Sequence, residues 1–129
     1  NLQEAEDIGL TTSFHPHMGS LVESPGQLDK VMEHTGVWLC PDCGHVFLGG
    51  GNPYQITEKY LERIKYFHLK GLMKMEYSAR WISEIDFGPI LKLLKGCKRK
   101  IELAVECDAN SSEPGRMPGQ LPDILQSME

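Results

Sequence analysis

Short apolar segments alternate along this chain with stretches in which apolar residues recur at helical spacing. Four of the apolar segments predict strands, at residues 10–15, 37–40, 65–69 and 101–106. A helix-like stretch connects each of these strands to the next. Helices that cross between successive strands favour parallel pairing. The pattern therefore predicts an α/β fold with about four parallel βα units.

Residues with N-capping side chains mark where the connecting helices begin. Ser24 precedes Pro25, and Gln27 completes a capping box with Ser24. Asn52 and Asp86 stand at the equivalent position before the second and third helices. Each helix start is thus predicted by a specific side chain as well as by apolar spacing.

Three segments predict loops or a tail. Residues 45–51 contain three successive glycines and predict a flexible active-site loop. Residues 71–84 predict a longer loop, which is either a substrate lid or a packed surface loop. Residues 109–129 are rich in Ser, Pro and Gly, and predict a poorly structured tail after a folded region at 1–108.

Residue types that bind metals stand at the ends of the predicted strands. Asp42, His68 and Glu106 each close a separate strand, and His15 closes the first. If the strands are parallel, their C-terminal ends lie side by side, as in the metal sites of (β/α) barrel enzymes. Imidazole and carboxylate ligands together suit a divalent ion such as Mn²⁺, Co²⁺, Mg²⁺ or Zn²⁺. The sequence therefore predicts a metal site made by Asp42, His68 and Glu106.

Further polar side chains are expected around that site. His15 and His17 are either a fourth ligand and a substrate contact, or surface imidazoles at a turn. His45, three residues beyond Asp42, can reach back to bind a substrate hydroxyl. Lys70 points the same way as His68 and can neutralise an enolate or a phosphate.

Length and charge limit what the chain can be. Its 129 residues suffice for one domain but not for an eight-stranded barrel, which needs about 250 residues, so we expect half of a barrel. A net charge of −5 argues against a nucleic-acid partner. No apolar run approaches the roughly 18 residues of a membrane helix. The four cysteines are too few for a disulfide scaffold, which favours reduced thiols and a cytoplasmic protein.

Four short motifs follow one another along the chain, at residues 13–20 (SFHPHMGS), 39–45 (LCPDCGH), 63–70 (RIKYFHLK) and 84–87 (EIDF). Taken in order, they resemble the xylose-isomerase-like TIM barrels, which include sugar phosphate isomerases and epimerases. The likeness runs from about Gly9 to Asp108 and corresponds to the C-terminal half of that family. The His-Pro-His-Met-Gly turn and the Ile-Asp-Phe step look most like inosose dehydratases.

The resemblance implies that Asp42, His68 and Glu106 are metal ligands and that His45 contacts substrate. Many members carry a Glu ligand at the end of the first strand of this half, where this chain reads His15-Pro16-His17. It further implies a metal-dependent isomerase, epimerase or dehydratase that acts on a small sugar, sugar phosphate or inosose through an enediolate. Under that hypothesis Glu106, His45 and Lys70 are catalytic, and His15, His17, His45 and Lys70 bind substrate.

Two alternatives remain open at this point. Cys40-Pro41-Asp42-Cys43 also looks like one knuckle of a zinc ribbon, although a structural site needs a second ligand pair. Alternatively, the chain is a non-catalytic barrel fragment or interaction domain. In that case it pairs with a copy of itself or with a missing N-terminal half, because half a barrel exposes two sheet edges.

Overall fold

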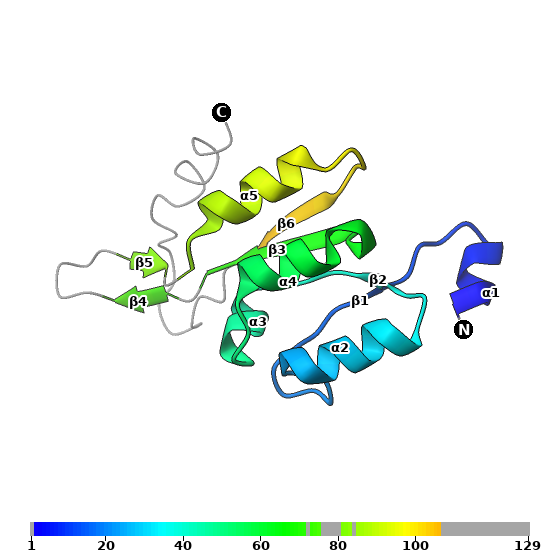
Figure 1. Ribbon diagram of the computed structural model, residues 1–129, viewed down its shortest axis with the longest axis horizontal. Coiled ribbons are helices and arrows are strands. Elements are labelled where there is room, and N and C mark those ends of the chain that lie inside the picture. Colours follow the sequence, from blue (N-terminus) through cyan, green and yellow to red (C-terminus); the bar gives the residue numbers. More distant parts are fainter. Residues whose placement is uncertain (1, 72, 76–80, 84, 107–129) are drawn as a thin grey trace, which may run out of the picture.

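The computed structural model describes residues 2–71, 73–75, 81–83 and 85–106. In these ranges the four predicted strands and the three helices that connect them follow in the predicted order, with α3, β4 and β5 between them (Figure 1). The elements are α1 (Leu2–Asp7), β1 (Ser13–Phe14), α2 (Pro25–His34), β2 (Trp38–Leu39), α3 (Cys43–Leu48), α4 (Pro53–Tyr60), the 3₁₀ turn η1 (Leu61–Arg63), β3 (Tyr66–Lys70), β4 (Met73–Met75), β5 (Trp81–Ser83), α5 (Phe87–Gly96) and β6 (Glu102–Glu106).

The strands that follow crossover helices pair in parallel, as predicted. Strand β1 pairs with β2, and β3 pairs with β6 over all five residues of each. Two isolated parallel bridges, Leu39 with Ile64 and Asp42 with His68, connect the β2 segment to the β3 segment. The backbone thereby brings the ends of β1, β2, β3 and β6 into one neighbourhood (Figure 1).

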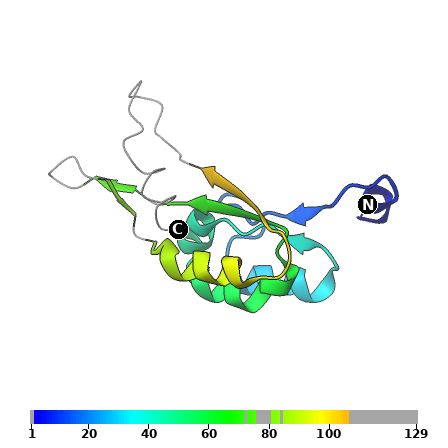
Figure 2. The same cartoon turned by 90° about the horizontal axis from the view of Figure 1, so that it is seen from above.

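Helices α2, α4 and α5 lie on one side of these strands (Figure 2). Side chains alternate along β3, so buried Phe67 and Leu69 lie on one face of the strand, while His68 and Lys70 lie on the other. The helices contribute most of the remaining buried apolar side chains to the same core cluster: Leu28, Met32, Ile56, Ile90, Leu91 and Leu94. The hydrophobic core therefore leaves the face that carries His68 and Lys70 available for polar chemistry.

The predicted helix caps are confirmed. The Ser24 side chain accepts from the Gln27 amide, and the Gln27 side chain accepts from the Ser24 amide, which completes the capping box. Asn52 accepts from the amide of Gln55, and Asp86 accepts from the amide of Gly88. Each cap satisfies an amide that the first helical turn would otherwise leave without a partner.

Several expected boundaries were wrong. Residues 45–51 do not form a loop throughout, because α3 continues to Leu48 and Gly50 then reverses the chain with φ of +81°. Residues 71–84 include an antiparallel pair, β4 with β5, in place of an uninterrupted loop. The first strand is shorter than predicted and spans two residues. Leu10, where the predicted strand begins, is 59% exposed and pairs with none of the described strands.

The predicted tail at 109–129 lies outside the described residues, so the division at residue 108 stays a prediction. Among the helices that the structure describes, none has the length and apolar character needed to cross a bilayer.

A candidate metal site at the ends of the parallel strands

Asp42 stands between β2 and α3 and is completely buried. Its Oδ1 accepts a hydrogen bond of 2.9 Å from the His45 amide and so begins α3. Its Oδ2 is buried without a hydrogen-bond partner and lies 3.8 Å from Nδ1 of His68. A buried carboxylate oxygen without a partner costs free energy unless a ligand satisfies it. Oδ1 of Asp42 therefore caps a helix, and Oδ2 is available to bind a ligand.

His68 and Glu106 lie opposite Asp42 on the paired strands β3 and β6. His68 Nδ1 is 3.0 Å from Glu106 Oε1, yet the contact lacks hydrogen-bond geometry and Nδ1 is also buried and unsatisfied. One donor atom from each of Asp42, His68 and Glu106 lies within 4.8 Å of the others. Two unsatisfied buried atoms beside a half-exposed carboxylate fit a divalent cation. The structure thus brings together the three predicted ligands.

Lys70 and His45 form a polar pair beside these donors. The buried Lys70 ammonium donates to His45 Nε2 at 3.2 Å and to Glu106 Oε2 at 3.4 Å. The Met18 amide also faces His45 Nδ1 at 3.4 Å. A neutral imidazole has one acceptor nitrogen, so only one of the two contacts with the ring is a hydrogen bond. We assign it to Lys70, because that contact is shorter and its donor is charged.

His45 is held in its neutral form by its surroundings. Burial lowers its pKa, the Asp42 carboxylate opposes that effect, and the Lys70 ammonium lowers the pKa further. Lys70 therefore supplies the positive charge of this pair, and His45 supplies a neutral hydrogen-bonding group.

His15 and His17 also reach the site, from the segment that follows β1. His15 Nδ1 donates to the carbonyl oxygen of Cys40 at 3.1 Å, and burial lowers the pKa of His15. The His17 side chain is exposed, with its ring centroid 3.7 Å from that of His45. The seven predicted site residues therefore gather at the same ends of the strands, whichever roles they have.

The structure places Cys40 with other neighbours than the sequence pattern predicted. The sequence grouped Cys40 with Cys43, but in the part of the chain that the structure describes Cys43 joins no group of converging metal-binding atoms. Cys40 instead converges with His15 and His68. Burial raises the pKa of both thiols, to about 11 for Cys40 and about 12 for Cys43. The signal was present in the sequence, since Cys40 ends an apolar segment just as His15 and His68 do.

Curated inosose dehydratases are similar in sequence over most of this chain. That of Clostridium botulinum (strain Alaska E43) is 31% identical over 132 aligned positions, which cover 85% of this chain and 44% of the relative. That of Clostridium beijerinckii is 34% identical over 70% of this chain and 38% of its own length. Inosose dehydratase 1 of Bacillus cereus is 39% identical over 64% of this chain and 29% of its own length.

Over most of its length the chain is thus similar in sequence to inosose dehydratases, which are xylose-isomerase-like enzymes. The resemblance drawn from the strand-end motifs is thereby confirmed. The chain spans less than half the length of the curated relatives that it matches. No protein-family model matches the sequence.

Proposed function

We propose that this chain carries the divalent-metal site of a lyase or isomerase that acts on inosose or a related small sugar. One observation supports the proposal above the others: Asp42 Oδ2 and His68 Nδ1 are buried, unsatisfied and within reach of Glu106. Asp42, His68 and Glu106 would hold the cation. When bound, a divalent cation would act as a Lewis acid on the substrate carbonyl.

The remaining steps belong to the side chains. Glu106 accepts the proton α to the carbonyl, because its carboxylate is the most exposed of the three ligands and is 40% accessible. The Lys70 ammonium donates hydrogen bonds to the oxygen that gains negative charge in the enediolate. His45, His15 and His17 bind substrate hydroxyls. Return of the proton from Glu106 to carbon then gives isomerisation or epimerisation, and its transfer to a β-hydroxyl, which leaves as water, gives dehydration.

Exchange of the α proton with solvent deuterium tests this function directly, since every outcome above begins with its removal. With Mn²⁺ and inosose in D₂O, we expect exchange that a chelator abolishes. Lys70→Met should slow exchange by about 100-fold, as expected for loss of one donor to a developing oxyanion. The exposed Lys92 on α5 supplies the matched control, Lys92→Met. A chain that binds Mn²⁺ and catalyses no exchange would contradict the catalytic part of the proposal.

We further propose that the four parallel strands are half of a (β/α)₈ barrel and pair with a second half. Leu103 and Val105 on β6 are 39% and 47% exposed, which leaves apolar side chains at a strand with one described neighbour, β3. The second half is a copy of this chain or a segment like the remainder of its longer relatives. Light scattering on the purified chain should show a dimer, which Val105→Lys should dissociate. A monodisperse monomer with a cooperative thermal transition would contradict self-pairing.

A further inference from the structure

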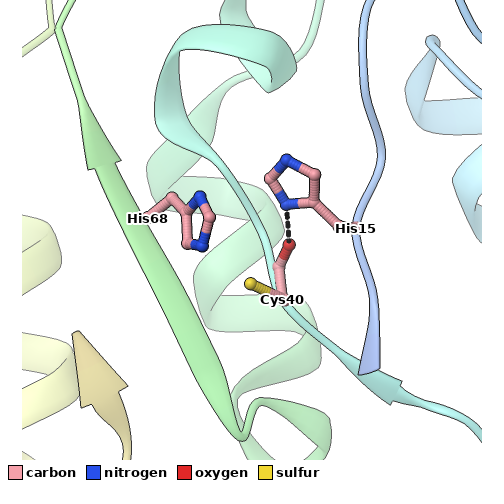
Figure 3. A group of neighbouring side chains, drawn as sticks. All are labelled: His15, Cys40 and His68. Atoms are coloured by element: carbon pink, nitrogen blue, oxygen red, sulfur yellow. Dashed lines mark hydrogen bonds between the residues drawn. The ribbon is translucent and has the colours of Figure 1, made fainter. Parts of the chain in front are cut away.

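Three of the strand-end residues form a second group of possible ligands that contains sulfur. His15, Cys40 and His68 each place one donor atom within 4.8 Å of the others. They come from the segment after β1, the segment after β2 and strand β3 (Figure 3). The His15 and His68 ring centroids are 4.6 Å apart. This group shares only His68 with the group of Asp42, His68 and Glu106.

The ring of His15 turns Nδ1 towards Cys40, whose carbonyl oxygen accepts a hydrogen bond of 3.1 Å from it, and Nε2 points away from the Cys40 sulfur (Figure 3). The ring nitrogen on the side of the sulfur therefore carries the proton of this hydrogen bond. A cation held there together with the sulfur would replace the hydrogen bond, and the ring would then carry its proton on Nε2.

The donor chemistry of this group differs from that of the oxygen-rich group. One sulfur and two imidazole nitrogens suit a thiophilic cation such as Zn²⁺ or Co²⁺ and leave a fourth tetrahedral position open. Two carboxylates and one imidazole suit Mn²⁺ or Mg²⁺ better. A neutral imidazole has a single lone pair, so His68 serves one cation at a time.

We propose that His15, Cys40 and His68 form an alternative zinc site which competes with the Asp42–His68–Glu106 site for His68. On binding, the Cys40 thiol loses its proton to solvent and its sulfur bonds to the cation. That zinc would prevent Mn²⁺ from binding rests on the function proposed above, whereas the binding of zinc itself does not. The cation that His68 binds would thereby decide whether Asp42 and Glu106 have an imidazole as their third ligand.

Titration of the purified chain with Co²⁺ tests the sulfur ligand, because a cobalt–thiolate bond gives a near-ultraviolet charge-transfer band that oxygen and nitrogen ligands do not. We expect the band in the unaltered chain and in Glu106→Gln, and its loss in Cys40→Ser. Cys43→Ser is the matched control, since Cys43 is also buried and lies three residues away. Zn²⁺ should displace Co²⁺. Cys40→Ser should weaken Zn²⁺ binding by more than about tenfold, because even the loss of a residue that only orients a metal ligand lowers the affinity by about that factor.

Other results would overturn the proposal. Co²⁺ bound without the charge-transfer band, or a band that survives Cys40→Ser and disappears in Cys43→Ser, would exclude Cys40 as a ligand. Far-ultraviolet circular dichroism of each variant identifies any loss of binding caused by unfolding. Mn²⁺ titrations of Asp42→Asn separate the two proposals: Mn²⁺ binding that ignores Asp42 contradicts the proposed function, and a missing cobalt–thiolate band contradicts only the zinc site.

Discussion

At the scale of single residues, Asp42 shows how one side chain serves fold and site together. One carboxylate oxygen caps α3 through the His45 amide, and the other remains available beside His68. An alanine at this position would remove both contributions, whereas Asn keeps an acceptor oxygen for the cap. Asp42→Asn is therefore the variant that isolates the role of Asp42 as a ligand.

Away from the site, Asp29 makes the stability of the chain depend on pH. Hydrogen bonds from Lys59 and Tyr60 lower its pKa below 3.8. A lowered folded-state pKa contributes stability above the unfolded-state pKa, and that contribution is lost as pH falls through the folded-state pKa. Asp29→Asn should therefore lower the free energy of unfolding modestly at neutral pH, and the difference should shrink at acidic pH.

Urea titrations across that pH range measure the difference. Glu33→Gln removes an exposed carboxylate from the same helix and serves as the control. A difference between the Asp29 variant and the unaltered chain that stayed constant down to pH values well below 3.8 would contradict the assignment.

At the scale of elements, the sequence predicted the helices better than the strands and loops. Side chains that cap helices are local signals, so Ser24, Asn52 and Asp86 marked the correct starts. The short strands β1 and β2 depend on neighbours that are distant in sequence, and local patterns overestimated their length. Helix α3 was missed because its N-cap, Asp42, had been interpreted only as a ligand.

The position of α3 depends on close packing at its C-terminal end. A Cβ atom on Gly49 would lie 1.9 Å from the carbonyl oxygen of Glu23, in the segment that leads into α2. Gly49→Ala should therefore force a backbone shift and destabilise the chain by about 1–3 kcal/mol in urea unfolding. Gly26→Ala, in the first turn of α2 with nothing within 4 Å of the added carbon, should be neutral or stabilise by up to about 1 kcal/mol. Equal effects would contradict this packing account.

At the scale of the whole molecule, the convergence of side chains could be predicted because it follows from topology. Parallel strands joined by crossover helices place their C-terminal ends together, which is why His15, Asp42, His68 and Glu106 could be grouped from sequence. Their detailed contacts could not, since the hydrogen bond from His15 to the Cys40 carbonyl depends on side-chain packing. The alternative pairing of Cys40 with Cys43 gains no third ligand among the described residues.

The central claim is that Asp42, His68 and Glu106 bind one divalent cation, and a Mn²⁺ titration followed by the paramagnetic resonance of free Mn²⁺ tests it most directly. We expect one binding site, with affinity lowered by at least about tenfold in Asp42→Asn and Glu106→Gln. Glu102→Gln, on the same strand but exposed and paired with Lys100, should bind as the unaltered chain does. A folded chain that binds no Mn²⁺, or that binds it equally in all three variants, would contradict the claim.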